Sequence, residues 1–491
     1  MLTIQRQLSR PFLILLALPS TAMGFALSVQ ISALSWLLTT KYGLHIHEIG
    51  LVWAAGPLAG IAGQLLIGFV SDRVWFWGGR RRPFIVVGGL LSALMLLALP
   101  SLGLISRALG LDAILGVAIV VALALDLSIN VSFNPTRSII ADVTAEGTTR
   151  TLGYTWMQTV SGTFGVLAYG IGAVLGNDVL IYVAAVLVVA FSVVPALLIE
   201  EPRTLGDGRA PSAAAGGRSH PGLARLLTIL LPLWGVLAYD VVAMALRLLR
   251  IESHSLLLEG ACGVATVVVL AITLTARDRG VEFVREDLVE FRKVLAAHSF
   301  SWIGVQTMFV YMIAFVQQRF PALAADGAGA VLSTSFGVLS AVAAVMPAVV
   351  LEPLTRRYGQ IGVHASCLAT MALGFAGVYV FGTAPWIIYA LMALMGIGWA
   401  AIVSLPFAIM SQRVDQSRMG LYMGVFNLSV VLPQLLVSLG IGTLVSQVAD
   451  KGLIFVIGAA SLGVSATAWL FVRRSAEPGA LRAVAPASPA H

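Results

Sequence analysis

Long apolar stretches, separated by short polar segments, run along almost the whole chain of 491 residues. Six of them precede the first sustained polar break, near residues 12–38, 47–70, 83–106, 112–140, 152–176 and 178–199. Six more occupy the C-terminal part, near residues 298–318, 328–350, 361–382, 385–411, 418–446 and 452–473. A helix needs about 20 residues to cross the hydrocarbon core of a membrane. The pattern therefore predicts an all-α membrane protein with two six-helix halves.

Two further apolar runs lie between the halves, near residues 223–246 and 255–275. They predict an inserted pair of helices, because a pair keeps both halves in the same orientation across the membrane. The chain would then cross the membrane fourteen times. A re-entrant or interfacial hairpin is the alternative, since Asp240, Arg247 and Arg250 interrupt the first run.

The segments around the inserted pair are polar. Residues 200–222 are rich in Gly, Pro, Ala and Ser and predict a flexible cytoplasmic linker. After the pair, apolar side chains recur at helical spacing among charged ones and predict an amphipathic helix on the cytoplasmic surface: Val281, Val284, Leu288 and Phe291. The expected divisions are an N-terminal half (1–199), a region with linker, inserted pair and surface helix (200–297), a C-terminal half (298–474) and a disordered tail (475–491).

Composition supports the membrane assignment and excludes several functions. Hydrophobic residues make up 58% of the chain and charged residues only 11%, against roughly a quarter charged in soluble domains. The net charge of +7 does not indicate nucleic-acid binding, because Lys and Arg fall in short interhelical loops. No nucleotide-binding glycine loop precedes a basic residue, and the histidines lack metal-ligand spacing. We therefore expect no enzyme activity, no cofactor and no metal.

One loop carries most of the orientation signal. Residues 68–85 are charged and glycine-bearing, and they lie between two apolar runs. Cytoplasmic loops are enriched in Lys and Arg, so this loop should be cytoplasmic. The parity of the spans then places both termini in the cytoplasm, and the expected location is the plasma (inner) membrane.

The fourth predicted span carries a polar stripe. At about 100° per residue, Asp126, Asn130 and Arg137 share one side of a helix. Asp126 and Arg137 should lie about 16 Å apart, too far for a direct ion pair. A carboxyl without a nearby cation in a partly dehydrated cavity suits proton coupling. A structural or gating role, or simple lining of a cavity, remains an alternative.

These motifs resemble the major facilitator superfamily, and more narrowly its sucrose/proton symporters and bacterial sugar-transporter relatives of the glycoside-pentoside-hexuronide type. The loop ends in Gly79-Arg80-Arg81-Arg82-Pro83-Phe84-Ile85. The fourth span reproduces the symporter spacing with Asp126, Asn130, Pro135, Arg137 and Asp142. Two motifs of the C-terminal half are also similar, Ser404–Ala408 and Gly424–Gln434. The likeness thus covers both halves.

The resemblance implies roles for particular residues. Asp126 would carry the coupling proton, and Arg137 would be an essential cation. Sugar hydroxyls would meet Gln30, Asn427 and Gln434, although packing roles are equally open for these amides. Trp36 suits an aromatic platform for the sugar ring. An inner gate would consist of Asp72, Arg73, Arg80, Arg81, Arg82 and Asp142, and the alternative is that the arginines only anchor the topology.

The sequence therefore predicts a proton-coupled symporter of a sugar or glycoside that works by alternating access, as a monomer in the lipid bilayer. The seventh core span departs from plant sucrose symporters, because it has Trp302, Gln306 and Arg319 but no carboxylate near its outer end. The substrate need not be sucrose itself. Two alternatives are a pigment-delivery or assembly factor related to bacteriochlorophyll-delivery proteins, and a transporter of another small solute.

Overall fold

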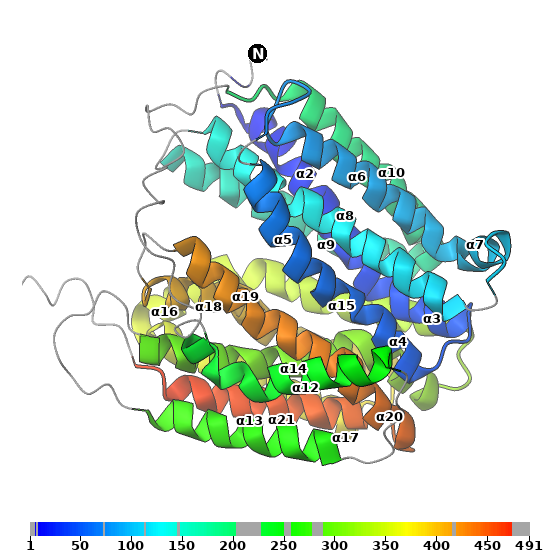
Figure 1. The fold of residues 1–491 in the computed structure, drawn as a ribbon, viewed down its shortest axis with the longest axis vertical. Helices are drawn as coiled ribbons and strands as arrows, with labels where there is room; N and C mark the ends of the chain where they lie inside the picture. Colours follow the sequence, from blue (N-terminus) through cyan, green and yellow to red (C-terminus); the bar gives the residue numbers. More distant parts are fainter. Residues whose placement is uncertain are drawn as a thin grey trace, which may run out of the picture.

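The computed structural model describes residues 5, 8–71, 74–111, 114–144, 148–202, 227–249, 257–276, 288–414 and 419–473. These residues form two helical bundles that lie side by side (Figure 1). One bundle is the N-half, drawn in blue to teal, and the other is the C-half, drawn mainly in yellow to red. Eleven of the described helices are long and apolar enough to cross a membrane. The predicted all-α fold with two six-helix halves is confirmed.

The N-half contains six helical passes. The first is continuous through α2 (Arg10–Val29), a π-helical turn η1 (Gln30–Leu34) and α3 (Ser35–Thr40). The others are α4 (Ile46–Trp53) with α5 (Ala55–Ser71), α6 (Arg82–Ala98) with α7 (Leu102–Ala108), α8 (Ile114–Val143), α9 (Thr148–Leu175) and α10 (Asn177–Leu198). The apolar pattern predicted all six.

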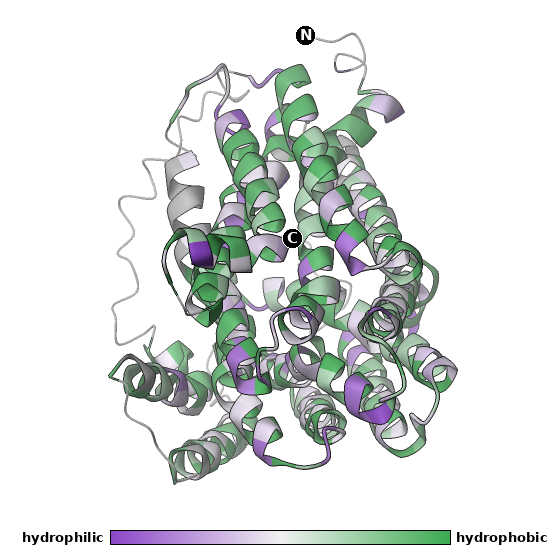
Figure 2. Cartoon of the chain, turned by 90° about the vertical axis from the view of Figure 1, so that its right-hand side faces the viewer, coloured by the Kyte–Doolittle hydropathy of each residue, from purple (hydrophilic) through white to green (hydrophobic). Residues whose placement is uncertain are grey.

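The C-half repeats this arrangement. Its passes are α14 (Leu288–Arg319), α15 (Ala325–Met346) with η5 (Pro347–Leu351) and α16 (Glu352–Tyr358), α17 (Gln360–Phe381), α18 (Pro385–Ser411), α19 (Met419–Leu436) with η7 (Val437–Ile441) and α20 (Gly442–Gln447), and α21 (Leu453–Leu470). In Figure 2 the helices are mostly hydrophobic, and strongly hydrophilic residues gather near helix ends and loops.

The start of α14 corrects one prediction. Leu288 and Phe291, assigned from the sequence to a surface helix, belong to the first turns of α14, and Phe291 is buried in the core. Charges suggested a surface position here, yet Glu290 and Lys293 are buried and paired with each other. Because the two opposite charges compensate each other, α14 can begin before residue 298, the predicted boundary. The rest of the proposed surface helix, the linker beyond Pro202 and the C-terminal tail lie outside the described residues.

The inserted pair is present as α12 (Trp234–Leu248), preceded by η4 (Leu231–Leu233), and α13 (Leu257–Thr275). The two helices pack closely, because a Cβ atom at Gly235 would overlap Thr266. Tyr239 of α12 shares a buried apolar cluster with Ala54 of the N-half and Leu439 of the C-half. The pair therefore covers a junction between the halves. Both helices are shorter than most of the core spans, so whether they cross the whole membrane stays a prediction.

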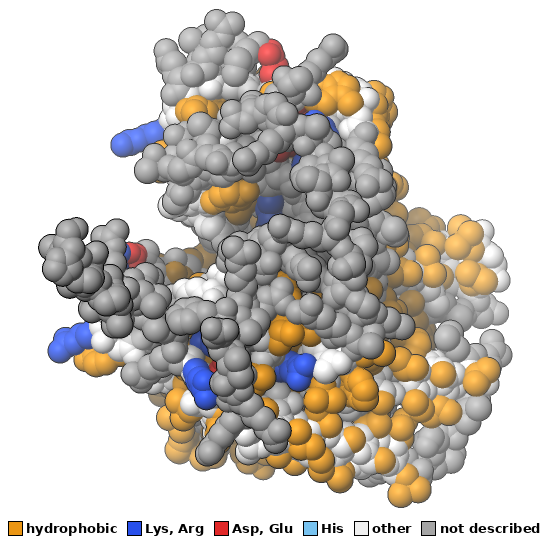
Figure 3. Space-filling model, turned by 60° about the vertical axis from the view of Figure 1, so that its left-hand side comes forward, with side chains coloured by type: hydrophobic (Ala, Val, Ile, Leu, Met, Phe, Trp, Pro, Cys, Tyr) orange, Lys and Arg blue, Asp and Glu red, His pale blue; other side chains and the backbone are white. Residues whose placement is uncertain are grey.

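The two halves meet at one end of the molecule and diverge at the other. We call the end that carries residues 74–82 the loop face (Figure 1), and the end where α4 contacts α20 and η1 contacts α15 the junction face. Figure 3 is turned toward the loop face and shows Lys and Arg side chains on this side of the molecule. The structure is thus closed at the junction face.

Candidate functional site: a buried carboxylate in the N-half

Asp126 lies in the middle of α8 and is 5% exposed. Both of its carboxylate oxygens accept hydrogen bonds from Gln30 Nε2, at 3.1 and 3.0 Å. No cation contacts this carboxylate among the described residues. Gln30 opens the π-helical turn η1, and such turns are frequent at functional sites because they redirect side chains. The structure therefore joins two predicted site residues, Asp126 and Gln30, into one pair.

Glycines let α5 approach this pair. A Cβ atom at Gly56 would lie 3.3 Å from Asp126 Oδ2, and one at Gly63 would lie 2.9 Å from Asn130 Cβ. Asn130 is half-buried, and its Nδ2 donates to the backbone carbonyl of Asp126 at 2.8 Å. Its amide thus bonds within the helix, one turn from the carboxylate.

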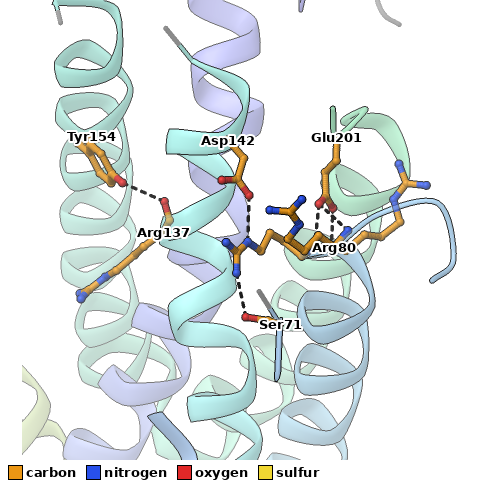
Figure 4. A network of polar contacts seen from close by, with 8 residues as sticks. Ser71, Arg80, Arg137, Asp142, Tyr154 and Glu201 are labelled. Atoms are coloured by element: carbon orange, nitrogen blue, oxygen red, sulfur yellow. Dashed lines mark hydrogen bonds and ion pairs between the residues drawn. The ribbon is translucent and has the colours of Figure 1, made fainter. Parts of the chain in front are cut away.

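Arg137 is separate from Asp126. Its guanidinium carbon lies 4.1 Å from the centre of the Phe133 ring, and its side chain is exposed. Tyr154 Oη donates to the Arg137 backbone carbonyl at 3.2 Å. In Figure 4 the Arg137 side chain points away from Asp142. A cation on an aromatic face keeps its hydrogen-bond donors available, as a ligand-binding arginine requires.

The C-half contributes amides and aromatic rings. Gln434 Nε2 donates to Gln306 Oε1 at 3.3 Å, which links α19 to α14. Asn427 is half-buried on the same helix as Gln434. Trp302 and Trp399 are also half-buried, with ring centres 5.7 Å apart and nearly perpendicular planes. No local pattern indicates that Trp302 and Trp399 meet, because they come from helices almost a hundred residues apart.

Trp36 does not form the predicted platform. It is buried at the junction face, where its Nε1 donates to Ala325 O at 2.8 Å. This hydrogen bond joins α3 of the N-half to α15 of the C-half.

The loop face of the N-half carries an ion pair. Arg81 is 6% exposed, and its Nε donates to Asp142 Oδ2 at 2.9 Å. Its Nη1 donates to Ser71 Oγ at 2.9 Å. Figure 4 shows these groups together with Glu201, whose carboxylate accepts the backbone N–H groups of Arg80, Arg81 and Arg82 at 2.7–2.8 Å. Sequence reasoning missed Glu201, although its place directly after the sixth span was a signal.

These contacts bear on the proposed gate. Arg81 and Asp142 meet, as the resemblance implies, while Arg82 donates to Ile199 O at 2.7 Å. All of these partners belong to the N-half. Asp72 and Arg73 lie outside the described residues. The contacts described hold the loop to its own half in this conformation, and the gate remains a prediction.

The C-half has its own buried ion cluster at the loop face, which the sequence did not reveal. Glu290 accepts from Lys293 Nζ at 2.8 Å, lies 3.7 Å from Arg413 Nη1, and accepts the Arg473 backbone N–H at 2.5 Å. This buried cluster ties together the ends of α14, α18 and α21. In the N-half, Gln5 binds the backbone of Glu200 in the equivalent place, through both its amide nitrogen and its oxygen.

The junction face is held by neutral groups. Ser32 and Ser333 bond through their hydroxyls at 2.6 Å, and both reach Asn177 Oδ1, at 3.1 and 2.9 Å. Ser35 Oγ donates to Val310 O at 2.9 Å. Glycines permit close crossing here, since a Cβ atom at Gly50 would lie 2.5 Å from Tyr311 Oη. These contacts join the two halves without ions.

Two six-helix halves that are closed at one end, with a buried polar pair inside the N-half, define a multi-pass membrane transporter rather than an enzyme. Residues 16–438 match the Major Facilitator Superfamily, and the chain belongs to that superfamily. It is 25% identical to the sucrose transport protein SUC4 of Arabidopsis thaliana, over 87% of this chain and 83% of that protein. It is 29% identical to the general alpha-glucoside permease of Schizosaccharomyces pombe, over 35% of this chain and 34% of the permease.

A solved structure has the same fold. The xylose transporter XylE from E. coli, in an inward open conformation, superposes with a TM-score of 0.59. The match covers 95% of this chain and 97% of XylE, at 14% identity. The likeness supports the fold of both halves together.

Proposed function

We propose that the protein is a proton-coupled symporter of a sugar or glycoside. The names of two relatives, a sucrose transport protein and an alpha-glucoside permease, support the substrate class. The observation that carries the coupling is Asp126, a buried carboxylate whose described hydrogen-bond partner is the neutral amide of Gln30.

The physical argument concerns the cost of charge. An ionised carboxylate buried without a cation loses several kcal/mol of solvation, and an amide donor compensates only part of this loss. Asp126 therefore favours the protonated form when the site is closed to water. Water reaching the site from one side would let the proton leave toward that side. Such a carboxyl can bind a proton on one side of the membrane and release it on the other.

The substrate site lies between the halves. Arg137 and Asn130 would serve it from the N-half, and Asn427, Gln434 and Gln306 from the C-half. Sugars combine hydroxyl groups with an apolar ring face, so they suit a few polar groups beside aromatic surfaces. Trp302 and Trp399 offer such a surface. Both sides of the site come from one chain, which fits a monomer.

The loop face is proposed to be cytoplasmic. Positive charges are enriched at cytoplasmic ends of spans, and this face carries most of them: Arg10, Arg80, Arg81, Arg82, Arg292, Lys293, Arg356, Arg357, Arg413 and Arg473. The junction face has a smaller set: Lys41, Arg107, Arg319 and Lys451. Both termini then lie in the cytoplasm, and a structure closed at the junction face is inward-facing. The two halves would rock about the central site.

The test is pH-driven uptake of radiolabelled sucrose and maltose into proteoliposomes. Asp126→Asn mimics the protonated carboxyl, so it should abolish uphill accumulation while sparing sugar exchange across the membrane. Asp240→Asn is the matched control, because Asp240 is also buried (4% exposed) but lies on α12, outside the two halves. Uphill accumulation by the Asp126→Asn protein would reject the coupling role. Uptake of neither sugar would reject the substrate class.

A further inference from the structure

Two histidines are buried in the C-half, and each lies against a tryptophan. His298 of α14 is 1% exposed, and its Nε2 accepts a hydrogen bond from Trp302 Nε1 at 3.0 Å. His364 of α17 is 0% exposed and contacts the Trp469 ring edge to face, with ring centres 4.5 Å apart. Neither ring nitrogen of His364 has a hydrogen-bond partner in the described part of the chain. The two histidines are alike in burial, and they differ in the hydrogen bond that His298 accepts from its tryptophan.

The hydrogen bond fixes the state of His298. An imidazole nitrogen accepts only when it carries no proton, so Nε2 is bare and the hydrogen resides on Nδ1. The ring is also clamped by Phe426 of α19, which stacks on it with ring centres 4.8 Å apart and planes 15° apart. His298 is thus a rigid acceptor, one helical turn before Trp302.

This arrangement changes what Trp302 can offer to a ligand. The indole has a single donor, its N–H, and His298 occupies it. Trp302 is half-buried. It begins a row of aromatic rings that continues through Trp399 to Phe309, with successive ring centres 5.7 and 5.4 Å apart. With its donor used, the exposed part of Trp302 presents only ring surface.

We infer that His298 is a positioning residue that holds the Trp302 indole as a stacking platform for the apolar face of a pyranoside ring. The inference rests on the proposed function and deepens it, because it favours glycosides whose ring hydrogens form a continuous apolar face. Hydroxyl recognition is left to the amides and to Arg137. Loss of the acceptor frees the indole to turn and gives it a competing donor.

The first experiment needs no substrate. The fluorescence of Trp302 is obtained by subtracting the spectrum of Trp302→Phe from that of the parent protein, since the chain has 10 tryptophans. His298→Leu should shift this difference spectrum, and His298→Gln, which supplies another acceptor, should restore most of it. His364→Leu removes an equally buried imidazole and should leave it unchanged. An unaltered Trp302 spectrum in His298→Leu overturns the inference.

The second experiment measures the half-saturating concentration of sucrose and maltose in proteoliposomes. His298→Leu should raise it about tenfold with little change in maximal rate, and His364→Leu should not. In the Trp302→Phe background, His298→Leu should add nothing, because coupled residues act as one unit. An equal effect in both backgrounds, or normal affinity in Trp302→Phe, overturns the inference. Persistent pH-driven uptake in these same variants would leave the symport proposal standing.

Discussion

The two faces of the molecule are held by different chemistry. At the loop face, buried ions cluster within each half: Arg81 with Asp142 in one, and Glu290 with Lys293 and Arg413 in the other. At the junction face, the halves are joined by hydroxyls, an amide and backbone carbonyls, through Ser32, Ser333 and Asn177. In this structure, ions join residues of the same half, and neutral groups join one half to the other.

The difference has a physical reason. A buried ion pair that is split leaves two uncompensated charges, at a cost of roughly 3–5 kcal/mol. A neutral hydrogen bond contributes a net of only about 0.5–1.5 kcal/mol. If the halves rock as proposed, an interface that opens in every cycle suits neutral bonds, and the ends of each half suit ions. Variants of the ion clusters should therefore change stability, whereas variants of the junction face should change conformation.

The largest effect is expected inside the C-half. Glu290→Gln would leave Lys293 and Arg413 as buried cations without their counterion, so the protein should lose roughly 3–5 kcal/mol of stability. Thermal unfolding in detergent would measure the loss. The control is Glu352→Gln, which breaks an exposed pair with Arg356 (side chains 58% and 78% exposed) and should cost less than about 1 kcal/mol. Equal destabilisation by both variants would contradict the assignment of the Glu290 cluster.

A smaller effect, on conformation, is expected at the junction face. Gly50→Ala places a methyl group against Tyr311 Oη and the Ser438 carbonyl, and such overpacking typically costs about 1–3 kcal/mol. The population open at this face should rise about tenfold, as measured by labelling of single cysteines from each side of the membrane. Gly60→Ala is the control, since no atom of the described residues lies within 4 Å of a Cβ atom there. Unchanged labelling in Gly50→Ala would show that this contact does not close the face.

The smallest effect is expected from one hydroxyl. Ser333→Ala removes the bonds to Ser32 and Asn177 and should shift the same labelling by about fivefold, for a net loss of about 1 kcal/mol. Ser335→Ala is the control, because Ser335 is equally buried on α15 but its hydroxyl has no hydrogen-bond partner among the residues that the structure describes. If both serine variants behaved alike, the hydroxyl network would not be what joins the halves.

The sequence predicted the helices well because a membrane imposes one strong constraint on length and polarity. Apolar runs predicted the ends of three passes within two residues: α6 to α7, α10 and α18. The start of α14 was wrong, because hydropathy treats Glu290 and Lys293 as exposed charges and cannot see that they compensate each other. Boundaries fail where partners come from distant parts of the chain.

For the candidate site, too, the sequence predicted features that lie on one helix and missed contacts between distant parts of the chain. Asp126, Asn130 and Arg137 could be grouped from helical spacing alone, since they lie on one helix. The pairing of Asp126 with Gln30 depends on a π-helical turn and on a contact across 96 residues, neither of which leaves a local signal. The meeting of Trp302 with Trp399 and the uncharged junction network likewise depend on how separate helices pack.

Substrate-induced proton movement tests the central claim most directly. Adding sucrose or maltose to de-energised proteoliposomes, with a pH probe in the weakly buffered medium outside, should make that medium alkaline as sugar and protons enter together. Asp126→Asn should abolish the pH change, whereas Asp240→Asn should preserve it. Sugar entry without alkalinisation in the parent protein, or an undiminished proton signal in Asp126→Asn, would contradict the account.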